Sequence, residues 1–120
     1  MSIATELQFA RAARELISDP ERWTQRAYAR NSSFICVDSS SRHACCWCSL
    51  GALRKAVAES GDGFTTLAYL ENRLNKSANR LYPEQKNIIS VNDTIGHAAA
   101  LRVFDETISR LEREVANGNA

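Results

Sequence analysis

The chain has 120 residues, of which 44% are hydrophobic, 24% charged and 8% aromatic. This length suits one ordinary domain, and the composition is that of a globular protein rather than a disordered or collagen-like chain. Fifteen basic and fourteen acidic residues give a formal charge of +1, so no strong overall field favours nucleic acid or an anionic membrane as a partner.

The first predicted helix begins at Ser2 or Thr5 and ends at Ile17, with apolar residues at helical spacing along one face. Thr5 and Gln8 fit a capping box, in which two side chains satisfy free backbone amides at a helix start. Proline disfavours helical geometry in the residue before it, so the pair at 19–20 ends this helix.

A short turn is predicted to follow, with Asp19 as its cap and Pro20 in its first position. Trp23 and Tyr28 come next and are expected to be large packing groups. Residues 31–41 look irregular, although the apolar run 34–37 suits a short strand.

The second predicted helix runs from His43 to Glu59. Its expected buried stripe is Cys46, Leu50, Leu53 and Val57. Cys48 is predicted to lie on the opposite face, on the side of Gly51. A glycine inside a helix costs about 1 kcal/mol relative to alanine, so Gly51 predicts that another group approaches the helix closely there.

Residues 61–63 end this helix, and Asp62 is expected to cap the third, which continues to the Tyr82-Pro83 pair. The third helix shows a regular apolar stripe formed by Leu67, Leu70, Leu74, Ala78 and Leu81. The run 88–91 favours a short strand that could pair with 34–37.

The last helix is predicted to begin at one of residues 92–94 and to extend to Ala116, with residues 117–120 as a frayed tail. Its apolar stripe is Leu101, Phe104, Ile108, Leu111 and Val115. The sequence therefore predicts a single, mainly α domain of about four helices, and it allows a minor two-stranded β piece.

Three residues form the candidate catalytic set. Asp93 and His97 are four residues apart on the predicted last helix, so the carboxylate could cap that helix and orient the imidazole. Cys48 could then act as a nucleophile, because a thiolate is favoured near a helix start or a histidine. The alternative is a structural cap beside a hydrogen-bonded histidine at the edge of the core.

All four cysteines lie between residues 36 and 48. Besides supplying a nucleophile, the cluster could bind a metal ion or pack in the core. Zinc takes four ligands, and five candidates are present, namely Cys36, His43, Cys45, Cys46 and Cys48. Only Cys45 and Cys48 have the spacing of a zinc knuckle, and no second pair follows. Cysteine also packs as a small hydrophobe, and we predict no metal and no cofactor.

The N-terminus lacks a basic segment followed by an apolar stretch, so no secretory signal is expected. The longest apolar runs are far too short to span a bilayer. We therefore expect a cytoplasmic protein with free cysteines. Basic and acidic residues alternate in the first quarter of the chain, which indicates a solvated face and makes nucleic acid an unlikely partner.

Several short motifs together resemble a family of small uncharacterised domains of bacterial and bacteriophage proteins. The motifs are Trp23 after the first helix, the run Trp47-Cys48-Ser49-Leu50-Gly51-Ala52, and Asn92-Asp93 before the last helix. The resemblance covers residues 5 to 115 and implies no activity. It implies that the family-like positions are Trp47, Cys48, Gly51, Ala52, Asn92 and Asp93, and it does not include His97, Cys36, Cys45 or Cys46. If the face with Cys48 and Gly51 meets Asn92 and Asp93, the result is a small polar pocket, with Trp47, Gly51 and Asn92 as candidate ligand-binding residues, or a helix-packing contact locked by a cap.

These observations favour a non-enzymatic interaction or regulatory domain, of phage or mobile-element origin, that binds a protein partner or a second copy of itself. A small-molecule ligand is also compatible with a polar pocket. A cysteine-dependent hydrolase or transferase using Cys48, Asp93 and His97 is the first alternative, and a Cys/His metal-binding domain is the second.

Overall fold

The computed structural model describes residues 2–61 and 63–118. Within these ranges the chain forms five α-helices, three short strands and three tight helical turns. In chain order the elements are α1 (Ile3–Leu16), η1 (Pro20–Arg22), β1 (Ala29–Arg30), β2 (Cys36–Val37), β3 (Cys46–Trp47), α2 (Ser49–Glu59), α3 (Phe64–Leu81), η2 (Pro83–Gln85), α4 (Ile88–Ser90), η3 (Val91–Ile95) and α5 (His97–Ala116). The prediction of a mainly α fold is confirmed.

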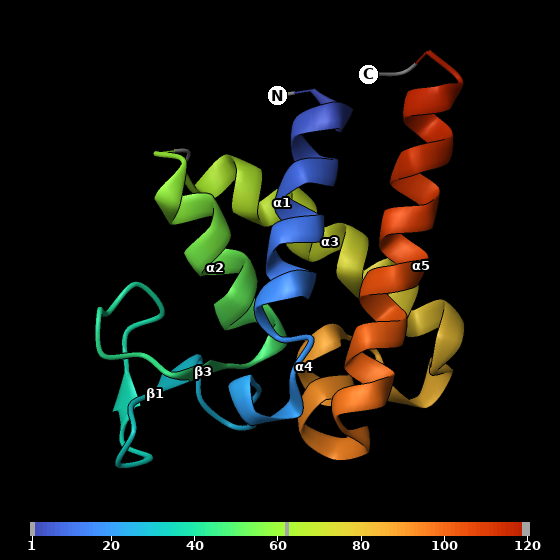
Figure 1. The fold of residues 1–120 in the computed structure, drawn as a ribbon. Coiled ribbons are helices and arrows are strands. Elements are labelled where there is room, and N and C mark those ends of the chain that lie inside the picture. The colour runs from blue at the N-terminus through green and yellow to red at the C-terminus, as the bar shows by residue number, and fades with distance from the viewer. Residues whose placement is uncertain (1, 62, 119–120) are drawn as a thin grey trace.

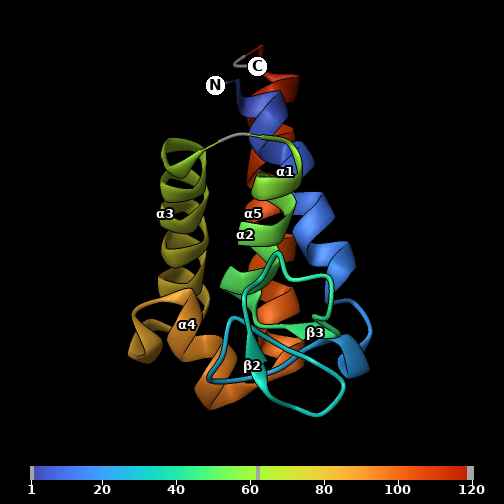
Figure 2. The same cartoon turned by 90° about the vertical axis from the view of Figure 1, so that its left-hand side faces the viewer.

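The four long helices pack side by side and alternate in direction, as Figures 1 and 2 show. The first turn of α1 and the last turn of α5 lie at one end, and the small sheet and α4 lie at the other. α1 packs mainly on α5 and α2, and α3 packs mainly on α5. The core contains one stripe from each helix, including the buried residues Ala13, Leu53, Leu70, Leu74, Phe104 and Leu111.

Ser2 caps α1, since its hydroxyl oxygen accepts a hydrogen bond from the Thr5 amide at 3.1 Å. The capping box predicted for Thr5 and Gln8 is therefore wrong, and of the two predicted starts the one at Ser2 is confirmed. Asp19 caps η1 by accepting a hydrogen bond from the Glu21 amide at 2.9 Å, as predicted.

The three strands form one antiparallel sheet in the order β2-β1-β3. Ala29 of β1 lies opposite Val37 on one side and Trp47 on the other. The strand expected at 34–37 is thus present only at Cys36–Val37. Its predicted partner is wrong, because β1 occupies that position.

The second helix begins at Ser49, six residues later than predicted, because Cys46–Trp47 pair with β1 instead of coiling. Cys46 is buried as expected, although it lies in a strand. Cys48 does not face away from the core: it is the N-cap of α2 and is 8% exposed. The end of the helix at Glu59 is confirmed.

The β run predicted at 88–91 is also wrong. Asn87 caps the short α4 by accepting a hydrogen bond from the Ser90 amide at 2.8 Å. The Ile88 amide donates to Asn75 of α3 at 2.9 Å, and the Ile88 side chain is fully buried. These contacts outweigh the β preference of the isoleucines, because propensity is weaker than tertiary packing.

The last helix begins at His97, several residues later than predicted, because Val91–Ile95 form the π-helical turn η3. Gly96 then has a φ of +132°, a conformation that favours glycine, and this residue separates the two segments. The predicted end at Ala116 and the buried positions Phe104 and Leu111 are confirmed.

The remaining expectations concern Asp62, Tyr28 and the C-terminal tail. Gly63 is the N-cap of α3, and the predicted Asp62 cap lies outside the described residues. Tyr28, expected to be a large packing group, is 43% exposed and has the Arg54 guanidinium over its ring, 4.2 Å from the centroid. In the predicted tail, Asn117 caps α5 and Gly118 has a positive φ, while residues 119 and 120 lie outside the described part.

None of the described helices is long and apolar enough to cross a bilayer.

Candidate functional site

Asn92 lies at the centre of the polar contacts that join the sheet end of the molecule to α2. Its side chain is 1% exposed, and every polar group on it is used. The side-chain oxygen accepts hydrogen bonds from Trp23 Nε1 at 2.8 Å, from the Ser49 amide at 3.0 Å and from Ser49 Oγ at 2.8 Å. The side-chain nitrogen donates to the Thr24 carbonyl and to Asp93 Oδ1, each at 3.0 Å.

These contacts bring together motifs that are far apart in the sequence. Trp23, the run beginning at Trp47, and Asn92-Asp93 meet at one place, with Asn92 as the common partner. The Thr24 amide also donates to the Trp47 carbonyl at 3.0 Å, next to a parallel bridge between the two tryptophans. The three motifs therefore form one structural unit.

Trp47 itself is buried, with 4% exposed, and its Nε1 donates to the Ser39 carbonyl at 2.9 Å. This contact fixes the loop between β2 and β3. Trp47 does not line the cavity described below.

Gly51 is positioned against the backbone of Tyr28. A Cβ atom placed on Gly51 would lie 1.9 Å from the Tyr28 carbonyl oxygen, a distance that no real side chain tolerates. The same oxygen accepts a hydrogen bond from the Cys48 amide at 3.2 Å. The close approach predicted at this glycine is thus confirmed, and the approaching group is backbone rather than a ligand.

The Cys48 thiol acts as the side-chain cap of α2. Its sulfur accepts a hydrogen bond from the Gly51 amide at 3.2 Å. Burial raises the pKa of the thiol above its ordinary value of 9.0, and the nearby negative charge of Asp93 raises it further, against the lowering effect of the Gly51 and Leu50 amides and of Arg54. Cys48 is therefore a neutral thiol at physiological pH, which does not favour nucleophilic attack.

A cavity of about 430 Å³ opens beside this unit. Cys48, Asn92 and Asp93 border it, together with mostly apolar groups from the sheet and α4. Tyr28 and Ile89 border it as well, and each is 43% exposed. We call it the Cys48–Asp93 cavity; its remaining lining residues are Arg26, Ala27, Cys36, Val37 and Leu50.

Asp93 is half-buried at the edge of this cavity. Its Oδ1 accepts hydrogen bonds from the Arg26 amide and from Asn92 Nδ2, each at 3.0 Å. Its second carboxylate oxygen, Oδ2, has no hydrogen-bond partner among the residues that the structure describes. Oδ1 thus holds the backbone at Arg26, and Oδ2 is available to a ligand.

His97 lies elsewhere. Its Nε2 is 2.6 Å from the Ile17 carbonyl oxygen, and its ring contacts Trp23 with centroids 5.2 Å apart. No hydrogen bond joins His97 to Asp93 within the described part of the chain, and His97 does not line the cavity. The structure brings two of the three candidate catalytic residues, Cys48 and Asp93, to one cavity and leaves the third outside it; catalysis by this set stays a prediction.

The cysteines do not assemble a metal site. All four are free, with Cys36 and Cys45 exposed and Cys46 and Cys48 buried. No group of three or more His, Cys, Asp or Glu side chains in the described residues is placed to hold a metal ion. The five ligands considered for zinc are therefore not gathered around one point.

Sequence reasoning identified Cys48, Asn92 and Asp93 at the site, but it did not identify Arg26, Tyr28 or Ile89 as lining residues. Ile89 belonged to the apolar run at 88–91, whose helical conformation turns Ile88 inward and leaves Ile89 exposed. Nothing in the sequence indicated Arg26. In the structure it is marked by its φ of +61°. That conformation, rare for a residue with a side chain, accompanies the hydrogen bond from its amide to Asp93.

Comparison with known proteins bears out one part of the resemblance, the one to an uncharacterised family. A family model described as a family of unknown function, DUF6197, matches residues 1–110. No curated protein and no solved structure matches the chain significantly. Since the family model covers most of the sequence, including Trp23, Cys48 and Asn92, the chain belongs to the DUF6197 family.

Proposed function

We propose that this chain is a non-enzymatic, cytoplasmic binding domain, and that the Cys48–Asp93 cavity receives a basic side chain of a protein partner. The observation that carries this proposal is the free Oδ2 of Asp93 at the edge of a mostly apolar cavity. A carboxylate in such surroundings gains from a cationic partner, since an unpaired, partly desolvated charge is unfavourable.

The lining of the cavity suits a lysine or arginine side chain. Such a side chain has a long apolar stem and a charged head, so it can cover apolar surface while its head pairs with a carboxylate. Leu50, Val37 and Ile89 supply apolar contacts, and Asp93 supplies the charge. Tyr28 and Ile89, which border the cavity, are each 43% exposed and add exposed apolar surface there, as expected where a partner binds.

One further observation agrees with the cytoplasmic part of this assignment. The four free cysteines are those of a protein in a reducing compartment. A phage or mobile-element origin would suit a small binding domain of this kind.

The experiment is a titration followed by amide chemical shifts, with n-butylguanidinium as a mimic of the arginine side chain and butanoate as an anion of similar size. We expect n-butylguanidinium to shift the amides of Cys48, Leu50 and Asp93 and butanoate to leave them unchanged. Asp93→Asn should abolish the response, because the amide oxygen can keep the bonds of Oδ1 while the charge is lost.

Asp38→Asn is the matched control, since Asp38 also accepts a backbone hydrogen bond, from Ser40 at 2.8 Å, and lies outside this cavity. Its response should equal that of the native chain. Equal shifts with both probes, or none with n-butylguanidinium, would exclude the proposal. Binding of the blocked tripeptide Ala-Arg-Ala more tightly than the free guanidinium supports a protein partner, whereas weaker binding of the peptide argues for a small cationic ligand.

A further inference from the structure

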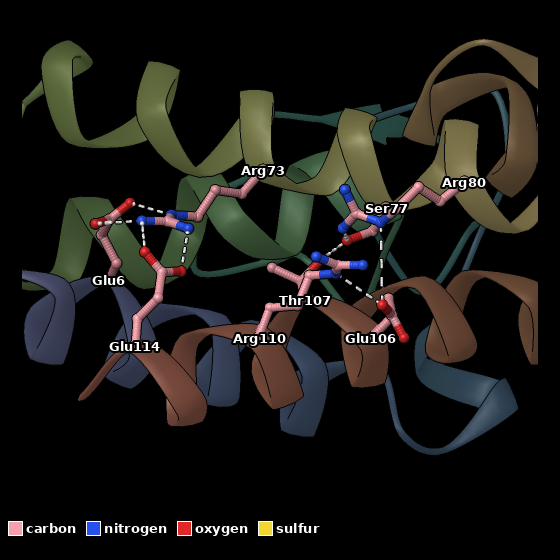
Figure 3. A network of polar contacts seen from close by, with 8 residues as sticks. All are labelled: Glu6, Arg73, Ser77, Arg80, Glu106, Thr107, Arg110 and Glu114. Atoms are coloured by element: carbon pink, nitrogen blue, oxygen red, sulfur yellow. Dashed lines mark hydrogen bonds and ion pairs between the residues drawn. The ribbon is translucent and has the colours of Figure 1, made fainter. Parts of the chain in front are cut away.

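A second cavity, of about 590 Å³, lies between α3 and α5, away from the Cys48–Asp93 cavity. We call it the α3/α5 cleft. Figure 3 shows how side chains from the two helices meet across it. Five of its lining residues are cationic: Arg73, Lys76, Arg80, Arg110 and Arg113. They recur every three or four positions, so each helix turns its basic residues to the same side.

One of these cations is fully engaged within the protein. Arg73 Nε donates to Glu6 at 2.8 Å and its Nη1 donates to Glu114 at 2.7 Å. Its Nη2 also lies near both carboxylates, at 3.5 and 3.4 Å (Figure 3). Since Glu6 belongs to α1 and Glu114 to α5, Arg73 joins three helices at one end of the cleft.

At the other end, two arginines share one carboxylate. Arg110 Nε donates to Glu106 at 2.8 Å, while Arg80 Nε lies 4.0 Å from the same oxygen (Figure 3). The hydrogen bond from Arg110 and the fields of Arg80 and Arg113 lower the pKa of Glu106 despite its partial desolvation. The basic groups here thus outnumber the carboxylates that face them.

Two of the cations make no direct ion pair in the part of the chain that the structure describes. Lys76 and Arg113 form no ion pair within the described residues, and both are exposed. Among the residues described, the ion pairs of the five cations involve three carboxylates, those of Glu6, Glu106 and Glu114, which leaves an excess of two positive charges in a chain whose formal net charge is +1. Arg113 is in the last turn of α5, where a cation is favourable, but Lys76 lies in the middle of α3 and has no such explanation.

Hydroxyl groups line the floor between the two ends. The oxygens of Ser77 and Thr107 are 2.8 Å apart, and each residue is 1% exposed. Arg80 Nη2 donates to Ser77 Oγ at 3.0 Å (Figure 3). The floor of the cleft is thus polar.

We propose that the α3/α5 cleft binds a short phosphate chain, a diphosphate or triphosphate group. Guanidinium and ammonium donors arranged around a polar hollow are the groups that recognise phosphate oxygens. From Arg73 to Arg80 the helix rises by about 10 Å at 1.5 Å per residue, so the cleft is long enough for more than one phosphate group.

The cleft recognises phosphate rather than a base. None of its described lining residues is aromatic, and stacking on aromatic side chains is how proteins hold unpaired bases. The excess charge lies on Lys76 and Arg113, so these two residues are the ones whose positive charge a phosphate chain would balance. This site does not depend on the function proposed above.

The test is calorimetric titration of the whole chain with sodium tripolyphosphate at low ionic strength. We expect binding by the native chain and a loss of about tenfold or more in affinity for the double variant Lys76→Gln/Arg113→Gln, as for the loss of charge-assisted hydrogen bonds. Arg42→Gln/Arg102→Gln removes the same charge from exposed positions outside the cleft, and its affinity should stay within about twofold of native.

Amide chemical shifts of the native chain provide a second measurement that needs no variant. Tripolyphosphate should shift Ser77, Thr107 and Arg110 first. Asp93→Asn should bind tripolyphosphate as the native chain does, which separates this site from the Cys48–Asp93 cavity. Absence of binding by the native chain, an equal loss in both double variants, or shifts spread over the whole surface would each overturn the proposal.

Discussion

The side-chain oxygen of Asn92 accepts hydrogen bonds from both the amide and the hydroxyl of Ser49, the first residue of α2. An α-helix begins with several amides that lack partners inside the helix. Here the Ser49 amide finds its partner on a residue 43 positions later in the chain. Asn92 therefore fixes the start of α2 relative to η3, and with it the position of Cys48 beside Asp93.

Replacing Asn92 with alanine should destabilise the fold strongly. The substitution leaves Trp23 Nε1 and the Ser49 amide without their acceptor and the Thr24 carbonyl without its donor. Each buried group left without a partner costs about 1–3 kcal/mol, so we expect a loss of about 3 kcal/mol or more in the free energy of unfolding. Denaturant unfolding measures it, with the exposed Asn79→Ala as a control that should change stability by less than about 1 kcal/mol.

Gly51→Ala should also destabilise, although alanine favours helix by about 1 kcal/mol over glycine. The new Cβ would clash with the Tyr28 carbonyl oxygen, which is backbone and is held by the Cys48 amide. Forcing these segments apart should cost about 1–3 kcal/mol net of that gain. At Gly63 a Cβ meets nothing within 4 Å, so Gly63→Ser should be neutral or slightly stabilising in the same unfolding measurement. A stabilised Gly51→Ala variant would show that the close approach is wrong.

Alkylation of the folded chain should separate the four thiols. Cys36 and Cys45 are exposed, whereas Cys46 and Cys48 are buried and the pKa of Cys48 is raised. Iodoacetamide at pH 8, followed by mass mapping, should label the first pair quickly and the second pair slowly. Fast and selective labelling of Cys48 would instead support the cysteine-dependent enzyme.

The raised pKa of Cys48 also predicts a dependence of stability on pH. In the unfolded chain the thiol ionises near its ordinary value of 9.0, whereas in the folded chain it stays protonated to higher pH. The unfolded state therefore binds fewer protons above pH 9, so stability falls as pH rises through that range. Cys48→Ser keeps a capping oxygen and lacks this ionisation, so the native chain should lose more stability than the variant between pH 8 and 10. Equal losses would contradict the assigned shift.

The ion pair between Arg73 and Glu6 should contribute more to the free energy of unfolding than an ion pair at the surface. Glu6 is 6% exposed, so Arg73→Met would leave a buried carboxylate without its partner. Breaking such a pair costs about 3–5 kcal/mol when it is fully buried; Arg73 is partly exposed, and we expect a loss nearer to 2 kcal/mol. Glu59→Gln breaks the exposed pair with Lys55 on α2, and should cost less than about 1 kcal/mol in thermal or denaturant unfolding.

The long helices were predictable because their apolar stripes are regular. α3 shows this best, since Leu70, Leu74 and Ala78 follow helical spacing and are all buried. The short elements were not predictable, because distant partners determine them. Cys46–Trp47 continue the helical pattern of α2 in sequence, yet they pair with β1. Hydrogen bonds that the Ile88 and Ser90 amides donate to Asn75 and Asn87 hold residues 88–90 in a helix despite their β preference.

The candidate site shows the same division. A single glycine with an unusual place in a helix signalled the contact with Tyr28, and the short motifs indicated Cys48, Asn92 and Asp93. The central role of Asn92 was not visible, since one asparagine in a sequence carries no sign of how many hydrogen bonds it forms. Asp93 belongs to η3 and His97 is the first residue of α5, so the break at Gly96 keeps the two residues from sharing one helix.

The separations of the Asn92 contacts along the chain have a kinetic consequence. Its partners Trp23 and Thr24 are 69 and 68 residues away, so long loops must close before these hydrogen bonds can form. Closing such loops is entropically unfavourable, and contacts of this kind slow folding. We therefore expect the helical hairpins to form first and the Cys48–Asp93 cavity to be completed late, so that this cavity exists only in the finished fold.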